Sequence, residues 1–355
     1  MTYKIIQWAT GAMGKTCLQA VIDHPAMELT GLFVYSADKA GKDAGVIARR
    51  EPVGVAATSN VDQILALDAD VVIHCARISP PFGSHDTELV RLLESGKNVI
   101  SINGHSDPGR WDGDRRAVLA AACAKGNSTL MGAGLNPGYA AEQLAVVATG
   151  ACSRVDRVDI TEYVDCRAVK HPDYVFGSLG FGSDPAAIDP NDAGWGPASL
   201  MNGMYSEVLS AMAARLGVDL QRVQTEHRVF PTADDLEIAA GVIPQGRVSH
   251  INWRWAGYVG DQHRLALSIH WFMETTHLPH AAPPLWDIDI VGQPCVHLKV
   301  EVEKHPEDTS RVTAEQLGLA GAVINAIPVI CDAPAGLLLR PVVTPYRADL
   351  GGWLP

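Results

Sequence analysis

The sequence predicts an α/β fold: a parallel sheet covered by helices in residues 1–135, followed by an α+β domain with a mixed or antiparallel sheet. Two observations predict it. In the first part, near-continuous apolar runs alternate with helical segments, which is typical of a parallel sheet buried on both faces. Further along, apolar and polar residues alternate, as in strands with one buried face. We expect the second domain to span 136–312, and a helix and tail over 313–355 to return to the first domain.

The elements of the first domain follow in order. Strands are expected at 4–8, 29–35, 53–57, 69–76, 98–102 and 129–132. Helices are expected at 14–23, 86–95 and 114–125. Gly96 and Gly126 are typical signals for the ends of the last two helices. Strands that alternate with helices in this way favour βαβ units.

The second domain has a different pattern. Strands are expected at 155–166, 248–256, 264–275 and 296–303. A helix is expected at 206–216 and another at about 314–329. Residues 172–198, rich in Gly, Pro, Asp and Ser, predict a long loop, and such loops are usually functional or mobile.

Two of these strands place polar side chains on one face. His250, Asn252 and Arg254 share a face of one strand. Ser268, His270 and Glu274 share a face of the other, because side chains alternate along a strand. This polar face either lines a binding cleft, forms a dimer interface or faces solvent.

Composition limits the function classes. The chain has 355 residues, with 28 Lys and Arg against 40 Asp and Glu, a formal net charge of −12. Without a basic cluster, such a chain is a poor partner for nucleic acid or an anionic membrane. The seven cysteines are scattered, so we expect a cytoplasmic protein without a disulfide framework. The longest apolar run, 317–330, contains Asn325 and Pro328 and is too short to span a bilayer.

Four histidines, His263, His270, His277 and His280, lie near one another in the sequence. A spacing of seven along a strand turns successive side chains to opposite faces. These histidines therefore do not converge, and we expect no metal site.

The segment A-T-G-A-M-G-K-T at 9–16 directly follows the first strand and opens a helix. Gly11 and Gly14 match the second and third glycines of G-x-G-x-x-G, with Ala9 at the first. In that motif, glycines let backbone amides approach a pyrophosphate, and the helix N-terminus faces the anion. The segment predicts a Rossmann domain for NAD(P), with contacts from Thr10, Gly11, Ala12, Met13 and Gly14.

Two alternatives to this interpretation stay open. Gly14, Lys15 and Thr16 resemble the end of a P-loop, G-x-x-x-x-G-K-[ST], but Ala9 stands where that motif needs glycine. The other alternative is a glycine turn that binds no ligand.

The end of the second strand bears on the choice of cofactor. An NAD site usually has Asp or Glu at this position to hold the ribose, and this chain has Ser36, with Lys39 and Lys42 close behind. A hydroxyl and a cation suit a 2′-phosphate, so we expect NADP, with Ser36 and Lys39 as contacts. NAD stays open, because Asp38 could hold ribose hydroxyls and the lysines could be solvated loop charges.

Two further segments carry a family resemblance. One is G-A-G-L-N-P-G-Y at 132–139; the other is V-I-N-A-I-P at 323–328, followed by A-P-A-G-L at 333–337. Together with the glycine turn, they resemble the dihydrodipicolinate reductase-like oxidoreductases, in particular the branch of 2,4-diaminopentanoate dehydrogenase and the native amine dehydrogenases. The resemblance covers the whole chain, and 132–139 is its most specific part.

The resemblance implies an NAD(P)H-dependent oxidoreductase that transfers hydride to a small C=O or C=N substrate. It also implies a homodimer with the active site in the cleft between the domains, and Asn136 and Tyr139 near the nicotinamide and the substrate. Ligands bind at the carboxyl ends of parallel strands, so we expect further cofactor contacts there. These are Cys75, Ala76 and Asn103. Tyr174, in the long loop, and His270 are candidate substrate contacts, or else ordinary packing residues.

The chain departs from that branch at one place. An amine dehydrogenase is expected to carry a glutamate just after the fifth strand, where it activates ammonia. Residues 101–107, S-I-N-G-H-S-D, contain none, and His105 is the nearest equivalent. An imidazole that titrates near neutral pH can protonate a carbonyl oxygen, so carbonyl reduction becomes as good an expectation as reductive amination.

Two further interpretations stay open at this point. His105 could be a solvated loop residue with no part in catalysis. The missing glutamate also keeps open a different class of protein, a non-catalytic sensor or regulator that binds NADP(H).

Overall fold

The computed structural model describes residues 2–78, 82–111 and 113–348, which divide into two compact units. The first comprises the residues up to 78, 83–139 and 302–341, and the second comprises 140–301 together with Phe82 and the residues from Val342 on. The units part at 139/140 and 301/302, whereas the sequence places the boundaries after 135 and 312. Residues 313–341, which include the C-terminal helix, belong to the first unit as expected, whereas residues 342–348 belong to the second.

The first unit is built on a seven-stranded sheet in which every pair of neighbouring strands is parallel. The strand order is β16-β6-β5-β4-β1-β2-β3. The bounds are β1 (Tyr3–Trp8), β2 (Met27–Phe33), β3 (Ala57–Thr58), β4 (Val71–His74), β5 (Asn98–Ser101), β6 (Thr129–Gly132) and β16 (Gly336–Leu337). The predicted parallel sheet is therefore confirmed.

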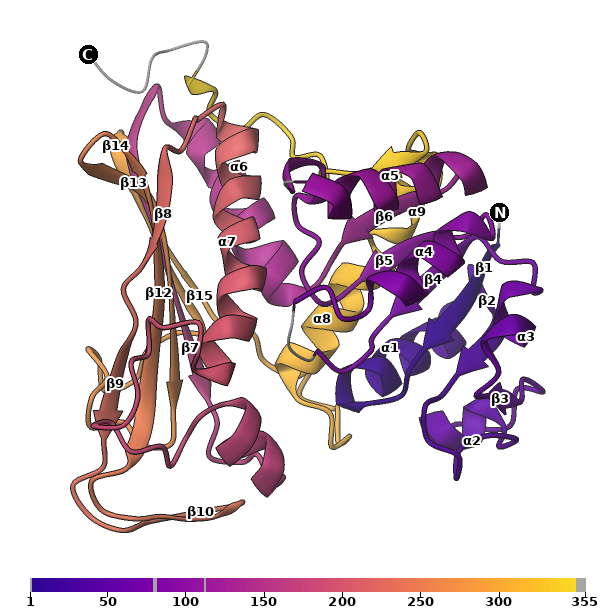
Figure 1. Ribbon diagram of the computed structural model, residues 1–355, viewed down its shortest axis with the longest axis horizontal. Coiled ribbons are helices and arrows are strands. Elements are labelled where there is room, and N and C mark those ends of the chain that lie inside the picture. The colour runs from indigo at the N-terminus through magenta and orange to yellow at the C-terminus, as the bar shows by residue number, and fades with distance from the viewer. Residues whose placement is uncertain (1, 79–81, 112, 349–355) are drawn as a thin grey trace. The chain divides into compact units, whose positions relative to one another are not determined.

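Helices lie on both faces of this sheet (Figure 1). They are α1 (Ala12–Asp23), α2 (Ala44–Ala48), α3 (Val61–Leu65), α4 (Asp86–Glu94), η1 (Pro108–Arg110), α5 (Gly113–Gly126), α8 (Ala314–Ile324) and α9 (Ile327–Asp332). Sequence reasoning missed α2 and α3, because five residues are too few to show a helical period.

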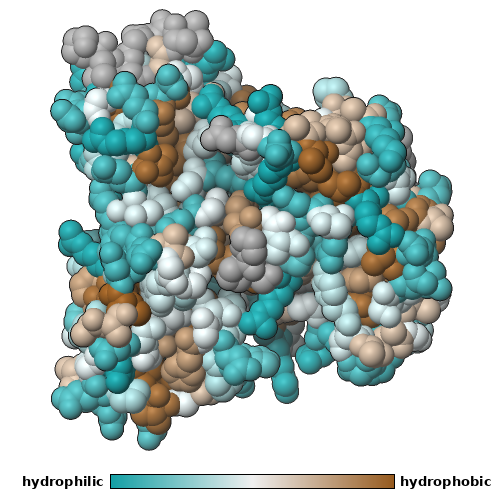
Figure 2. Space-filling model, in the orientation of Figure 1, coloured by the Kyte–Doolittle hydropathy of each residue, from teal (hydrophilic) through white to brown (hydrophobic). Residues whose placement is uncertain are grey.

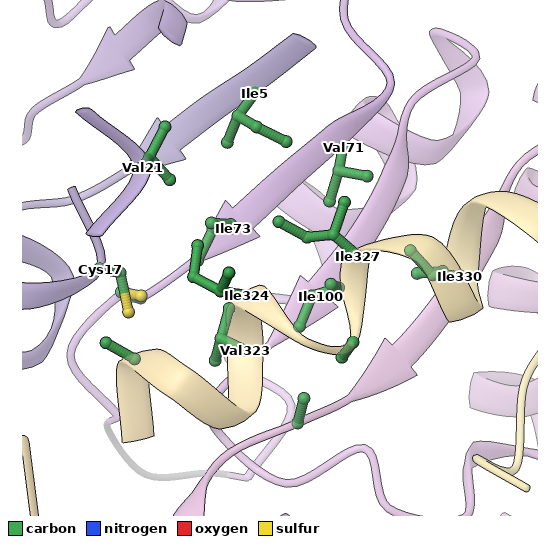
Figure 3. Packing of buried hydrophobic residues seen from close by; sticks show 14 of the residues in the cluster. Ile5, Cys17, Val21, Val71, Ile73, Ile100, Val323, Ile324, Ile327 and Ile330 are labelled. Carbon is green, nitrogen blue, oxygen red and sulfur yellow. The ribbon is translucent and has the colours of Figure 1, made fainter. Parts of the chain in front are cut away.

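The helices α8 and α9 pack on one face of the sheet beside α1. Figure 3 shows Val323, Ile324 and Ile327 facing Ile73 and Ile100 of the central strands. By length and composition alone, Ala314–Asp332 is apolar enough to cross a membrane. Its inner face is filled by the core, however, and the break after Ile324 divides it into two helices, as the interrupted apolar run predicts.

The second unit is built on a mixed sheet in the order β15-β14-β7-β13-β12-β8, with β9 also paired to β12. Only β7 and β13 pair in parallel among these strands of the described chain. The bounds are β7 (Arg154–Asp165), β8 (Arg222–Thr225), β9 (Arg228–Pro231), β12 (Val248–Val259), β13 (Gln262–Phe272), β14 (Trp286–Gln293) and β15 (Val296–Val300). A separate hairpin joins β10 (Leu236–Ile238) to β11 (Gly241–Ile243).

One long helix, α7 (Gly196–Leu216), packs on one face of this sheet, where Tyr205 stacks on Trp255. The helix begins ten residues before the expected start at 206. Pro197 lies in its first turn, where proline is favoured, so the predicted loop 172–198 ends earlier than its composition indicates. That segment also contains the short helical turn η4 (Asp173–Ser178).

The remaining short helices run on from β6. They are η2 (Leu135–Ala145), α6 (Val146–Ala148) and η3 (Thr149–Ala151). Within η2, Asn136, Pro137 and Gly138 have non-helical backbone angles, so this segment is a turn that leads into a helix at Tyr139.

The polar side chains of the two strands lie on one face of the second sheet, as predicted, and their register brings them opposite one another. Asn252 lies opposite His270, and Arg254 lies opposite Ser268 and donates a 2.9 Å hydrogen bond to it. His250 and His270 are both buried, which corrects the expectation that this face could be exposed to solvent. On the view in Figure 2, hydrophobic side chains form separate groups among hydrophilic ones, the normal surface of a globular unit.

Candidate dinucleotide-binding site

The predicted cofactor residues of the first unit gather at the carboxyl edge of its sheet. Neighbouring parallel strands end there at Trp8, Phe33, His74, Ser101 and Gly132. In open α/β sheets, ligands bind in the crevice outside this edge.

The glycine turn has the shape that a pyrophosphate requires. Gly11 is the N-cap of α1, and a Cβ added to it would meet no atom within 4 Å. A Cβ on Gly14 would instead lie 2.4 Å from the carbonyl oxygen of Ala9 and 3.1 Å from Cβ of Cys75. Gly14 therefore permits close packing of helix on strand, whereas Gly11 keeps open the space in which a ligand would lie.

The first turn of α1 offers unused donors to that space. The first bond within the helix runs from the amide of Lys15 to the carbonyl of Gly11 at 2.9 Å. The amides of Ala12, Met13 and Gly14 lie before it, have no acceptor within the helix, and receive no cap from the side chain at Gly11. A dinucleotide pyrophosphate fits these residues, because helix N-termini bind anions through such amides.

The loop after β2 is joined to the glycine turn. Lys39 Nζ donates to Thr10 Oγ1 at 3.0 Å and to the Thr10 carbonyl at 3.3 Å. The Ser36 hydroxyl donates to the Asp38 carboxylate. Partial burial, followed by the charges of Arg49 and Lys39, lowers the pKa of Lys15. Three cations therefore lie near one another here, of which sequence reasoning identified only Lys39.

Sequence reasoning missed Lys15 and Arg49 for separate reasons. Lys15 lies inside the glycine motif, where its position indicates only the P-loop alternative. Arg49 is ten residues beyond Lys39, and its backbone adopts the left-handed conformation after α2. No signal in the sequence places it beside Lys15.

The residues after β4 and β5 hold each other in place. Cys75 and Ala76 are buried, and Cys75 packs against Gly14. The side-chain amide of Asn103 donates to the Ala76 carbonyl at 2.7 Å. Asn103 therefore positions the loop after β4, and its amide nitrogen is already committed to that contact.

His105 is buried, with 4% of its surface exposed, so it is not a solvated loop residue. Its backbone has φ of +61°, and its carbonyl accepts from the Gly132 amide at 2.9 Å. Its ring meets Trp111 edge-on, with centroids 5.3 Å apart. Burial above all, and then the charge of Arg115, lowers the pKa of His105 well below 6.5. The imidazole is therefore neutral at neutral pH, which corrects the expectation of titration near pH 7.

Asn136 and Tyr139 lie just beyond β6 at the same edge of the sheet. Gly138 between them has φ of +127°, a conformation that favours glycine. Tyr139 is 41% exposed. The turn thus presents a tyrosine ring to solvent instead of burying it in the core.

The two candidate substrate residues of the second unit, Tyr174 and His270, differ in how far they are buried. Tyr174 in η4 is 41% exposed. His270 is buried, stacks on Tyr163 with centroids 5.1 Å apart, and shares a 2.8 Å hydrogen bond with His250. A substrate role for these two residues stays a prediction.

The chain is similar to known oxidoreductases. Residues 5–80 match the family model of the dihydrodipicolinate reductase N-terminus. An amine dehydrogenase from Streptomyces virginiae is 24% identical over 95% of this chain and 97% of its own length.

Two solved structures share the fold. The amine dehydrogenase of Mycobacterium smegmatis matches with a TM-score of 0.75 and 17% identity, over 98% of both chains. A scyllo-inositol dehydrogenase of Lactobacillus casei, solved with NAD(H) and scyllo-inositol, matches with a TM-score of 0.53 and 15% identity, over 95% of this chain and 92% of that one. The resemblance predicted from the sequence is confirmed: the chain is similar to amine dehydrogenases along nearly its whole length, and its residues 5–80 are similar to the N-terminus of the dihydrodipicolinate reductases.

Proposed function

We propose that this nicotinamide-dependent oxidoreductase transfers hydride between NADP(H) and the carbon of a small C=O or C=N group. The observation that carries the proposal is the open space at Gly11, bordered by the free amides of Ala12, Met13 and Gly14. The nicotinamide, when bound, supplies the hydride. The relatives are oxidoreductases, and none of them supports the alternative of a non-catalytic sensor.

The preference for NADP rests on the charges around the glycine turn. Lys39 is held against Thr10, and the charges of Lys39 and Arg49 both act on Lys15 in the glycine turn. A 2′-phosphate monoester carries the opposite charge and accepts charge-assisted hydrogen bonds. Asp38 is hydrogen-bonded to Ser36, and it is the residue through which NAD would compete.

The substrate class rests on the segment after β5. The similar proteins from Streptomyces and Mycobacterium are named amine dehydrogenases, which favours C=N chemistry. This chain has Asn103 and His105 in place of the glutamate expected there. A neutral imidazole does not replace a carboxylate as the base that deprotonates ammonium, but it donates a hydrogen bond to a developing alkoxide. We therefore place carbonyl reduction first and imine reduction second.

The remaining assignments belong to the same proposal. His105 assists proton transfer, and Asn136 and Tyr139 contact the nicotinamide and substrate from the end of β6. Tyr174 and His270 contribute to substrate binding from the second unit. The active protein is a cytoplasmic homodimer, which implies that part of its surface is buried between copies.

The experiment is a turnover panel. The wild type is incubated with NADPH or NADH and with ketones, aldehydes or preformed imines, with and without ammonia, and loss of the reduced cofactor is followed by absorbance. We expect ammonia-independent oxidation of NADPH with at least one carbonyl class. Tight NADPH binding without turnover on any class would contradict the enzyme assignment and favour a sensor. The G11V variant serves as the control, because it fills the ligand space and leaves the packing of α1 unchanged.

A further inference from the structure

A second cluster of side chains lies at the same sheet edge, outside the glycine turn. It comprises His74 at the end of β4, His85 at the N-cap of α4, and Glu88 in the first turn of that helix. One ligand atom from each lies within 4.8 Å of the others. The cluster is separate from His263, His270, His277 and His280, whose spacing predicts no metal site.

The spacing of the three groups matches a metal site better than it matches hydrogen bonds. His74 Nε2 lies 3.3 Å, and His85 Nδ1 lies 3.4 Å, from Glu88 Oε2. Charge-assisted hydrogen bonds from nitrogen to carboxylate are shorter, about 2.7–2.9 Å. Donor atoms held about 2.0–2.1 Å from a tetrahedral zinc ion lie about 3.3–3.4 Å apart. Both separations from the imidazole nitrogens to Glu88 Oε2 have this length, and the two nitrogens lie within 4.8 Å of each other.

The surroundings orient these groups toward one point. His85 Nε2 lies 2.8 Å from the Arg77 carbonyl, so the ring donates there and leaves Nδ1 to face Glu88. The Tyr35 hydroxyl donates to Glu88 Oε2 at 2.7 Å and accepts from Trp8 Nε1 at 3.0 Å. Backbone carbonyls and hydroxyls that hold the ligands in this way are typical of the second layer of a metal site.

The burial of the three side chains also favours a metal site. The side chain of His74 is 1% exposed, and its Nδ1 has no hydrogen-bond partner within the part of the chain that the structure describes. Its polar contact is therefore the one at Nε2, inside the cluster. His85 and Glu88 are 21% and 28% exposed, which leaves a route for an ion to enter and one coordination position for water.

From this geometry we propose that His74 Nε2, His85 Nδ1 and Glu88 Oε2 bind one divalent transition-metal ion, with Zn²⁺ as the best fit. Two imidazoles and a carboxylate with an open fourth position form a recurrent zinc ligand set. The ion would tie the end of β4 to the start of α4, next to Cys75 and Ala76. With Glu88 ionised and both imidazoles neutral, the occupied site would carry one net positive charge.

The test titrates Zn²⁺ alone into full-length protein that has been treated with a chelator, without cofactor or substrate. Calorimetry, with competition by a chromophoric chelator, should give one tight equivalent per chain. Co²⁺ in its place should give the strong visible absorption of a four-coordinate site. Because no nicotinamide is present, failure of this proposal and failure of the proposed oxidoreductase activity are distinguishable.

Matched variants locate the site. E88Q and H85Q should each weaken Zn²⁺ binding by more than about 100-fold, and Y35F by about tenfold or more, because it removes only the hydroxyl that supports Glu88. H263Q is the control, because His263 also lies 3.3 Å from a carboxylate, that of Asp159, but belongs to no three-ligand group among the described residues. Circular dichroism checks that each variant folds. Absence of a tight equivalent in the wild type, or unchanged affinity in folded E88Q and H85Q, would overturn the proposal.

Discussion

The α-carbon of Gly14 lies so close to the carbonyl of Ala9 that a Cβ at position 14 would come within 2.4 Å of that oxygen. The Cβ is fixed by the backbone of residue 14 and the oxygen by the backbone of Ala9, so no side-chain rotation relieves the contact. G14A should therefore destabilise the protein by about 1–3 kcal/mol, the usual cost of overpacking. Chemical denaturation measures this, and a variant as stable as the wild type would show that the turn relaxes without strain.

A substitution at Gly11 should affect cofactor binding and not stability, the opposite of one at Gly14. A side chain at Gly11 meets open space in the protein, so G11V should leave the free energy of unfolding within about 0.5 kcal/mol of the wild type. The same side chain occupies the volume of the pyrophosphate, so affinity for NADP(H) should fall by more than about 100-fold. Calorimetry tests this, and unchanged affinity would remove the glycine turn from cofactor binding.

Ala9 itself has φ of +72°, in the left-handed region that residues with a Cβ avoid. It occupies the position at which the dinucleotide motif usually has glycine. A9G should therefore stabilise the protein, by about 0.5–1 kcal/mol after the entropic cost of glycine in the unfolded chain. A decrease in the midpoint of chemical denaturation would contradict this account.

The sequence predicted the regular part of the first unit closely, for a physical reason. Strands such as β4 (Val71–His74), buried on both faces, are nearly continuous apolar runs. The glycine turn has a fixed relation to its strand and helix. The sequence did not predict features that depend on contacts between residues far apart in the chain. The burial of His105 depends on Trp111 and on the backbone at Gly132, and the start of α7 at Gly196 depends on packing that outweighs a loop-like composition.

The cluster of His74, His85 and Glu88 could not be predicted from the sequence either, because it also depends on contacts between distant residues. His74 is hidden in an apolar strand, and the sequence does not show that a residue eleven positions later returns to it. Parallel sheets bring strand ends together across long separations, so a site at the carboxyl edge is assembled from residues whose spacing has no period. Only the glycine turn, which is contiguous, could be identified with its ligand from the sequence.

Lys39 should distinguish the two cofactors. K39A removes a cation that is held 3.0 Å from Thr10 Oγ1 and whose charge acts on Lys15. Affinity for NADP(H) should weaken by about 1–3 kcal/mol, while affinity for NAD(H) stays nearly unchanged, because only the former has a 2′-phosphate. Exposed Lys42 provides the control variant K42A. Equal losses for both cofactors in K39A would show that Lys39 only supports the turn.

His105 should act as a neutral group. H105A should lower turnover by about 10²–10⁴-fold and leave the dissociation constant for NADP(H) unchanged. Because burial lowers the pKa of His105 well below 6.5, the neutral form is present throughout the neutral range. Wild-type turnover should therefore not fall as the pH rises from about 6 to 8 on account of this residue. Full turnover in H105A would remove His105 from the mechanism, and efficient ammonia-dependent amination would overturn the preference for carbonyl substrates.

The paired histidines of the second unit should make the fold sensitive to acid. Burial lowers the pKa of His270 to about 4, and burial together with the neighbouring charges of His270 and His277 lowers the pKa of His250 to about 3. Their unfolded values are near 6.5, so below that pH the unfolded chain takes up protons that the folded chain does not. The stabilisation they provide is complete above about pH 6.5 and is lost as the pH falls toward 4.

H270Q tests this assignment, because glutamine can still hydrogen-bond to His250 but does not titrate. The variant should reduce the loss of unfolding free energy between pH 7 and 4 by roughly 2–3 kcal/mol, as denaturant titrations at each pH would measure. H297Q is the matched control, because the His297 side chain is 67% exposed on the same sheet. An identical pH dependence in H270Q and H297Q would show that His270 takes up its proton as readily in the folded protein as in the unfolded chain.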